Sequence, residues 1–175
     1  TRKITKAMQM VAAAKLRRAQ EAAEMARPYA ERMASVMGGL AQSVGTSDSA
    51  PKLLAGTGSD QTHLIVVLTS ERGLAGGFNS SIVKLARARI AKLQAAGKTV
   101  KILTVGKKGR EQLRRDHSDK FVKHFDMSDV KRVGYAHARE VAQDILSRFD
   151  ASEFDVATMF FNTFQNVVTQ IPTET

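Results

Sequence analysis

The residues of this chain that could do chemistry are few, and the most distinctive of them form a glycine-rich stretch. Glu71–Asn79 (ERGLAGGFN) follows an apolar run and opens a helical pattern, where α/β folds hold phosphates on backbone amides. Its glycines are spaced G-x-x-G-G rather than G-x-G-x-x-G, and no G-K-[ST] follows. The spacing favours a tight turn over nucleotide binding. We expect an exposed loop on which Arg72 is positioned to meet another subunit.

No catalytic, cofactor or metal site is predicted. The chain has no cysteine, which excludes disulfides, thiolate metal sites and thiol catalysis. Two serines, Ser80 and Ser81, stand at the start of a helical pattern, where their hydroxyls commonly bond the backbone. Four histidines lack the spacing of metal ligands: His63, His117, His124 and His137. We therefore expect a protein that is not an enzyme and carries neither a cofactor nor a metal.

The charge of the chain is positive and unevenly distributed. The net charge is +10, and six cations precede the first acid, Glu21: Arg2, Lys3, Lys6, Lys15, Arg17 and Arg18. Such a run indicates an acidic partner, which is nucleic acid, anionic lipid or an acidic protein loop; the plain alternative is a solvated helix face. No aromatic residues are interleaved with these cations, so support for nucleic acid rests on charge alone.

The segment that carries these cations predicts one very long helix, from about residue 3 to residue 44. Its apolar residues recur every three or four positions, as in a coiled coil, although Lys15 falls on the same stripe. The helix would run roughly 60 Å, whereas the remaining ~130 residues form a body with a radius of gyration of about 14 Å. Pro28 predicts a bend near Glu24. The predicted seam comprises Ile4, Ala12, Ala19, Ala22, Ala26, Tyr29, Met33, Val36 and Leu40.

After a polar linker, predicted as flexible over 45–62, strand and helix patterns alternate in residues 63–175. Alternation of this kind predicts an α/β fold: a Rossmann-like, mainly parallel sheet with helices on both faces. Ser128 is expected to cap the last helix, with Val130, Val133, Val141, Ile145 and Leu146 facing inward. No apolar run approaches the ~20 residues that span a bilayer. Strands are expected at 64–68, 100–105, 120–125, 154–161 and 167–171, and helices at 79–96, 107–116 and 128–149.

Several stretches together resemble the gamma subunit of F-type ATP synthases. Ile4–Leu16 (ITKAMQMVAAAKL) is similar to the amino-terminal helix of that family, and Arg27–Ala30 continues the likeness through the proline. Glu71–Asn79 resembles the family's strand-to-helix loop, and Asn162–Thr173 resembles the segment before its carboxy-terminal helix. Ala75 stands where some members have cysteine, so thiol regulation of the plant type is not expected.

The resemblance implies a three-part chain: a shaft helix over 1–44, a linker over 45–62 and a Rossmann-like domain over 63–175. The shaft would be half of an antiparallel coiled coil inside a ring of three alpha and three beta subunits. The body would sit on the epsilon subunit and the membrane c-ring, with one copy in each complex. The residues implied to contact the beta subunits are Lys3, Lys6, Met8, Met10, Lys15, Arg17, Arg18 and Arg72.

The expected function is therefore that of a noncatalytic rotor that couples c-ring rotation to the beta-subunit sites. Its expected place is the cytoplasmic face of the bacterial inner membrane, or the matrix face in a mitochondrion, as a peripheral protein. The alternatives are a basic coiled-coil module that binds nucleic acid and, third, a nucleotide-binding enzyme. Because the chain starts at Thr1 and ends at Thr175 with no second long helix, we expect missing segments at both ends.

Overall fold

The computed structural model describes residues 2–44, 47 and 49–175. It divides into two compact units, 1–55 and 56–175, and each is considered by itself. Residues 45, 46 and 48, which belong to the predicted linker, lie outside the described residues. The same predicted linker contains a short helix, α2 (Lys52–Ala55), whose last two amides donate to the carbonyl of Pro51.

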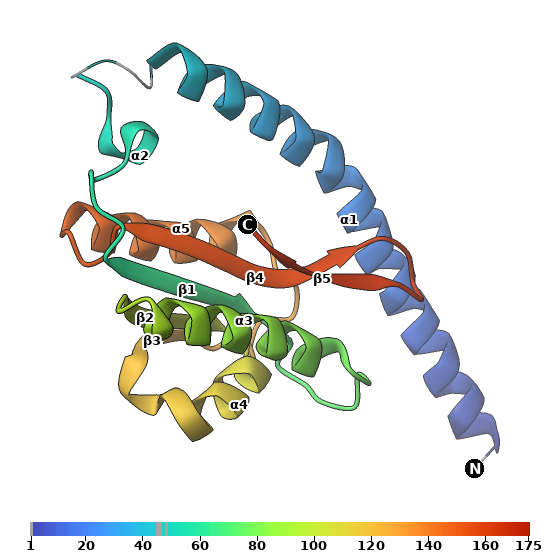
Figure 1. Ribbon diagram of the computed structural model, residues 1–175. Coiled ribbons are helices and arrows are strands. Elements are labelled where there is room, and N and C mark those ends of the chain that lie inside the picture. The colour runs from blue at the N-terminus through green and yellow to red at the C-terminus, as the bar shows by residue number, and fades with distance from the viewer. Residues whose placement is uncertain (1, 45–46, 48) are drawn as a thin grey trace. The chain divides into compact units, whose positions relative to one another are not determined.

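The first unit consists mainly of one helix, α1 (Arg2–Val44), of 43 residues. It runs through Pro28 without interruption and is curved rather than straight (Figure 1). The long helix is confirmed, whereas the position of the bend near Glu24 stays a prediction. None of the residues of α1 is buried. No hydrophobic core therefore stabilises α1 within this unit. A helix of this kind gains most of its stability by packing against a partner.

The second unit is built on a five-stranded sheet of order β3-β2-β1-β4-β5. Four strands are parallel, and β5 is antiparallel to β4 at one edge. β1 is buried from His63 to Val67 because layers cover both of its faces. The strands are β1 (Thr62–Leu68), β2 (Thr99–Val105), β3 (Phe121–Phe125), β4 (Val156–Phe164) and β5 (Gln170–Glu174).

Helices cover both faces of this sheet (Figure 1). α3 (Phe78–Ala95) and α4 (Lys107–His117) pack on one face, where Ile82, Ile90 and Leu113 are fully buried. α5 (Tyr135–Asp150) covers the other face with Val141, Ile145 and Phe149. A one-turn 3₁₀ helix, Ser118–Lys120, connects α4 to β3. The predicted α/β fold is confirmed, and β3 lies at an edge of the sheet.

The predicted start of α5 is wrong. The helix begins at Tyr135 and not at Ser128, because the Ser128 amide donates to Asp126 Oδ1 at 2.8 Å in a separate turn. The ring of His137 caps α5 by accepting a hydrogen bond from the Gly134 amide at 2.9 Å. Val133 and Leu146, which were expected to face inward, are 67% and 42% exposed.

The last strand is also shifted from its predicted place. β5 runs from Gln170 to Glu174, and the residues before it form the turn of a hairpin with β4. Asn166 Oδ1 accepts hydrogen bonds from the amides of Val168 and Thr169 at 2.9 and 2.8 Å. Asparagine forms such turns readily. The two valines of the turn supplied the apolar pattern that mimicked a strand.

Gly106, at the junction of β2 and α4, brings the ends of β1 and β2 together. Its φ of +97° lies in the region that favours glycine, and a Cβ there would stand 2.1 Å from the carbonyl oxygen of Thr69. Thr69 in turn accepts a hydrogen bond from the Gly109 amide on its hydroxyl at 2.8 Å. This close approach positions the loop that follows β1.

Replacement of Gly106 by alanine should therefore destabilise the body strongly. We expect Gly106→Ala to lower the free energy of unfolding by about 3 kcal/mol or more, because backbone strain and a backbone clash add. Gly97→Ala is the matched control, since Gly97 also has a positive φ, +73°, but open space around it. Gly97→Ala should lower the free energy of unfolding by only about 1 kcal/mol. Urea unfolding followed by circular dichroism measures both, and equal losses would contradict the close-packing argument.

Candidate subunit-binding surfaces

The apolar stripe of α1 lies open to solvent. All nine predicted seam residues are exposed, with Ile4 at 66%, Tyr29 at 68% and Val36 at 57%. Four of the nine are alanines, so the stripe is narrow at its centre and widens toward Leu40. A row of exposed apolar side chains along one face of a helix is typical of an interaction site. The geometry is that of a helix with one face available to another helix.

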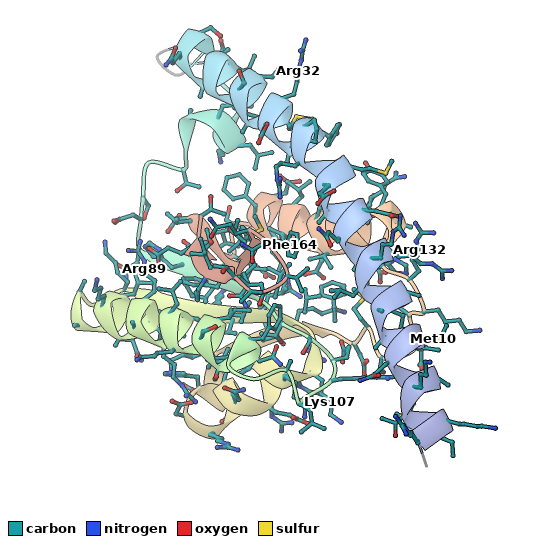
Figure 2. The ribbon with its side chains drawn as sticks, turned by 90° about the vertical axis from the view of Figure 1, so that its right-hand side faces the viewer. Met10, Arg32, Arg89, Lys107, Arg132 and Phe164 are labelled. Carbon is teal, nitrogen blue, oxygen red and sulfur yellow. The ribbon has the colours of Figure 1, made fainter. Side chains whose placement is uncertain are left out.

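The N-terminal end of the same helix carries the cations. All six basic residues that precede Glu21 are exposed. Arg17 forms an ion pair with Glu21 at 3.0 Å, but both side chains are more than half exposed, so the pair contributes little. Met8 and Met10 lie among the cations and are 68% and 66% exposed. Figure 2 shows the labelled Met10 and Arg32 side chains projecting from α1 at well separated points.

The loop between β1 and α3 is anchored at its base by Ser70 and Asn79. The Ser70 amide donates to Asn79 Oδ1 at 2.9 Å, and Asn79 Nδ2 donates to Ser70 Oγ at 2.8 Å. The Ser70 hydroxyl donates to the Arg72 carbonyl at 2.6 Å. Asn79 is only 7% exposed, so this pairing replaces water with hydrogen bonds inside the fold.

Glu71 adds a second anchor, at the carboxyl edge of the sheet. Its Oε1 accepts from the Met127 amide at 2.7 Å and its Oε2 accepts from the Lys107 amide at 3.2 Å. Lys107 is the first residue of α4, so the carboxylate lies at a helix N-terminus, where negative charge is stabilised. In related folds this position receives a phosphate. Here the Glu71 carboxylate already accepts the hydrogen bond of the Lys107 amide.

Beyond these anchors the loop is exposed. Arg72 and the residues as far as Gly77 lie in solvent, and Figure 1 shows the loop projecting past the N-terminal end of α3. The expected exposed loop with Arg72 is confirmed, whereas contact of Arg72 with a subunit stays a prediction. Leu74 is 109% exposed, and its φ is +57°, in the left-handed region.

His63 and His124 each have a hydrogen-bond partner within the fold. His63 Nε2 lies 2.8 Å from the Asp60 carbonyl oxygen, and His124 Nδ1 lies 2.8 Å from the Thr104 hydroxyl. Burial lowers the pKa of both His117 and His124 below its ordinary value. Among the described residues, His, Cys, Asp and Glu nowhere gather into a group of three or more that could hold a metal ion. No helix in the described part of the chain is both long and apolar enough to cross a bilayer.

Sequence reasoning missed two features of the loop. Glu71 was recognised only as part of a glycine-rich motif, because its bonds to Lys107 and Met127 join residues 36 and 56 positions apart. Leu74 carried no signal of its left-handed backbone, which glycine usually adopts.

Comparison with known proteins identifies relatives along the whole chain. It is 73% identical over 173 residues to a protein of Ruegeria sp. (strain TM1040) named ATP synthase gamma chain, and 70% identical to the protein of that name in Paracoccus denitrificans (strain Pd 1222). Both alignments include 99% of this chain and 60% of the relative. The chain thus spans about 60% of the length of these curated relatives.

The fold has a solved counterpart. A chain in the cryo-EM structure of the Tetrahymena thermophila mitochondrial ATP synthase central stalk/c-ring aligns with a TM-score of 0.72 and 24% identity. The alignment covers 98% of this chain and 70% of that chain, and at this identity it establishes the fold alone. A family model described as ATP synthase matches residues 1–175. Because that match extends over the whole sequence, the chain belongs to the family of ATP synthase gamma chains.

Proposed function

We propose that this chain is the shaft-bearing part of a central-stalk rotor in an F1Fo ATP synthase. The observation that carries the proposal is α1, a 43-residue helix with no buried residue and one apolar stripe. A helix of this length and exposure suits a shaft that makes its contacts with other chains. Family membership supports the assignment.

The partner for the apolar stripe is a second helix from the same protein. The chain spans about 60% of the length of its relatives, and we propose that the remaining part of such a full-length protein supplies this helix. An antiparallel coiled coil buries the stripe, and the four seam alanines allow the two helices to approach closely.

The basic end of α1 and Arg72 meet acidic loops of the beta subunits. A single asymmetric shaft inside a threefold ring presents a different face to each beta subunit and thereby biases their sites toward different conformations. Contacts between solvated cations and carboxylates can slide, because they are screened and weakly directional. Met8 and Met10 add flexible apolar contact. The proposed residues are Lys3, Lys6, Met8, Met10, Lys15, Arg17, Arg18 and Arg72.

The rest of the complex follows from the rotor role. The epsilon subunit and the membrane c-ring bind the body, one copy of the chain is present in each complex, and the catalytic sites belong to the beta subunits. The protein is then peripheral, in the F1 sector at the cytoplasmic face of a bacterial inner membrane. Bacterial relatives support this placement.

Assembly with purified alpha and beta subunits tests the proposed function directly. The full-length chain should be captured as one copy in a hexameric ring, as measured by native mass spectrometry, and should raise ATP hydrolysis by the ring. A chain limited to residues 1–175 should bind more weakly, because its stripe has no partner helix. Preferential binding of DNA, with an affinity that falls steeply with salt, together with no binding of the ring, would contradict the rotor role.

The cations at the basic end should control the rate of assembly. We expect the triple variant Lys15→Gln, Arg17→Gln, Arg18→Gln to associate with the ring at least tenfold more slowly at low salt, because electrostatic steering is lost. The matched control removes three exposed cations of the body through Lys92→Gln, Arg114→Gln and Arg115→Gln. Stopped-flow measurements over a salt series should show a weakened salt dependence in the first variant alone. Equal losses would indicate an effect of net charge only.

A charged side chain in the seam should destabilise the proposed coiled coil. In the full-length chain, we expect Ala26→Glu to destabilise the coiled coil by about 2–4 kcal/mol, since a carboxylate would leave water and no cation lies one turn away on the stripe. Ala13 lies on the opposite side of the helix by its 3.6-residue period, so Ala13→Glu should change stability by no more than about 0.5 kcal/mol. Thermal unfolding followed by circular dichroism separates the two. Equal stability of both variants would show that the stripe is not buried.

A further inference from the structure

The entry segment, residues 56–61 (GTGSDQ), has the composition of a flexible linker but is bonded to the body. It consists of two glycines and four polar residues, and none of them belongs to a helix or a strand. Chains rich in glycine and small polar residues usually behave as random coils. The entry segment belongs to the second compact unit, and Figure 1 shows it running into the start of β1.

The bonds on one side of the entry segment converge on Asp155, which immediately precedes β4. Its Oδ1 accepts a hydrogen bond from the Thr57 hydroxyl at 2.8 Å. Its Oδ2 accepts from the Thr62 amide at 2.9 Å and from the Ser59 hydroxyl at 3.3 Å. The Asp155 amide in turn donates to the Thr62 carbonyl at 2.8 Å. Both carboxylate oxygens are thus bonded to residues that lie 93 to 98 positions earlier in the sequence.

These bonds favour the ionised form of the Asp155 side chain. The Thr62 amide, followed by the Thr57 hydroxyl, lowers the pKa of its carboxyl below the ordinary value. Hydrogen bonds to a charged acceptor are roughly twice as strong as those between neutral groups. A single carboxylate therefore holds three donors that would otherwise bond water.

On its other side the entry segment is bonded to the turn between α3 and β2. The Gln61 side-chain amide donates to the Gly97 carbonyl at 2.9 Å, and the Thr99 amide donates to the Gln61 carbonyl at 2.9 Å. Lys98 forms an ion pair with Asp60, but the Asp60 side chain is 70% exposed and such pairs contribute little. Because β1 lies between β2 and β4 in the sheet, the entry segment continues this arrangement beyond the end of the strand.

The hydrophobic core already holds β1 without the help of Asp155. Residues 63–67 of β1 are buried, and burial of apolar surface is the dominant favourable term in folding. Asp155 and its partners lie outside this core, at exposed or half-exposed positions. They act at the point where the chain enters the sheet. This place suits a mechanical role.

We propose that Asp155 is a mechanical anchor that passes load on the linker into β4 as well as into β1. In its absence, tension on the linker would act on the first residues of β1 alone and would open the ladder one bond at a time. With Asp155 in place, the load is shared with β4 and with the turn after α3. This proposal rests on the proposed function, in which shaft and body turn together and the segments that join them transmit torque.

Amide exchange in the full-length chain tests whether Asp155 holds the entry segment. In Asp155→Ala, exchange of the amides of residues 59–62 should become roughly tenfold faster or more, because three hydrogen bonds to a charged group are lost. Exchange in residues 64–67 should stay unchanged. Asp150→Ala is the matched control, since it removes an exposed carboxylate at the end of α5 and should leave exchange in both segments unchanged. Equal exchange rates in the two variants would overturn the anchor.

Thr57→Val is a milder variant that leaves the carboxylate in place. It removes the donor to Oδ1 and should speed exchange of the same amides roughly threefold, the effect of one hydrogen bond. This variant tests the proposal even where Asp155→Ala fails to fold. Exchange at the rate of the unaltered chain would overturn the anchor.

Torsional stiffness is the property that a merely structural role would not change. The full-length chain is assembled with a ring of alpha and beta subunits, and a bead is fixed to the body through Gln143→Cys on the exposed side of α5. In the paused rotor, the angular variance of the bead should be roughly twofold larger for Asp155→Ala than for Asp150→Ala, because one of the two proposed connections between shaft and body is loosened. ATP hydrolysis without load should be equal in both. Equal variance would overturn the mechanical role.

Failure of this proposal can be told apart from failure of the proposed function. If the ring captures the unaltered full-length chain and the two variants show equal bead variance, the rotor role stands and the anchor is overturned. If the ring does not capture the unaltered chain, both are overturned.

Discussion

An α-helix cannot remove its own apolar stripe from water, and α1 is governed by this constraint. Its 43 residues form backbone hydrogen bonds within the helix, yet none of them is buried. Tertiary packing normally supplies most of the stability of such a helix. We propose that a second helix covers the apolar stripe, whose alanines would allow that helix to come close. The proposed shaft is a consequence of this unmet need for burial.

The body satisfies the opposite requirement, because its sheet is covered on both faces. β1 and β2 are held between α3 and α4 on one side and α5 on the other. Parallel strands place their carboxyl ends along one edge, and the loop that follows β1 emerges there. Gly106 allows close approach at this edge, and Glu71 uses it to bond two further segments. A rigid sheet thus supports a rigid loop.

The parts of this fold that depend on local pattern could be predicted from the sequence. The apolar run at β1, the periodicity of α3 and the stripe of α1 each reflect a repeat that the backbone imposes. The start of α5 could not be predicted in this way. The Ser128 amide bonds the Asp126 side chain in a separate turn, and the ring of His137 caps the helix instead. The stripe and the cations of α1 were visible in advance. The anchoring bonds of Glu71 are tertiary, and the left-handed backbone of Leu74 has no signature in residue type.

The order of the elements along the chain has a consequence for synthesis. α1 precedes every strand, so a ribosome completes it first and then needs roughly 6 to 26 s to make the ~130 residues that follow. During that interval the stripe is in water beside other nascent chains. Small alanines and a surplus of positive charge limit its tendency to aggregate. The composition that suits the proposed shaft therefore also protects α1 from aggregation before it meets a partner.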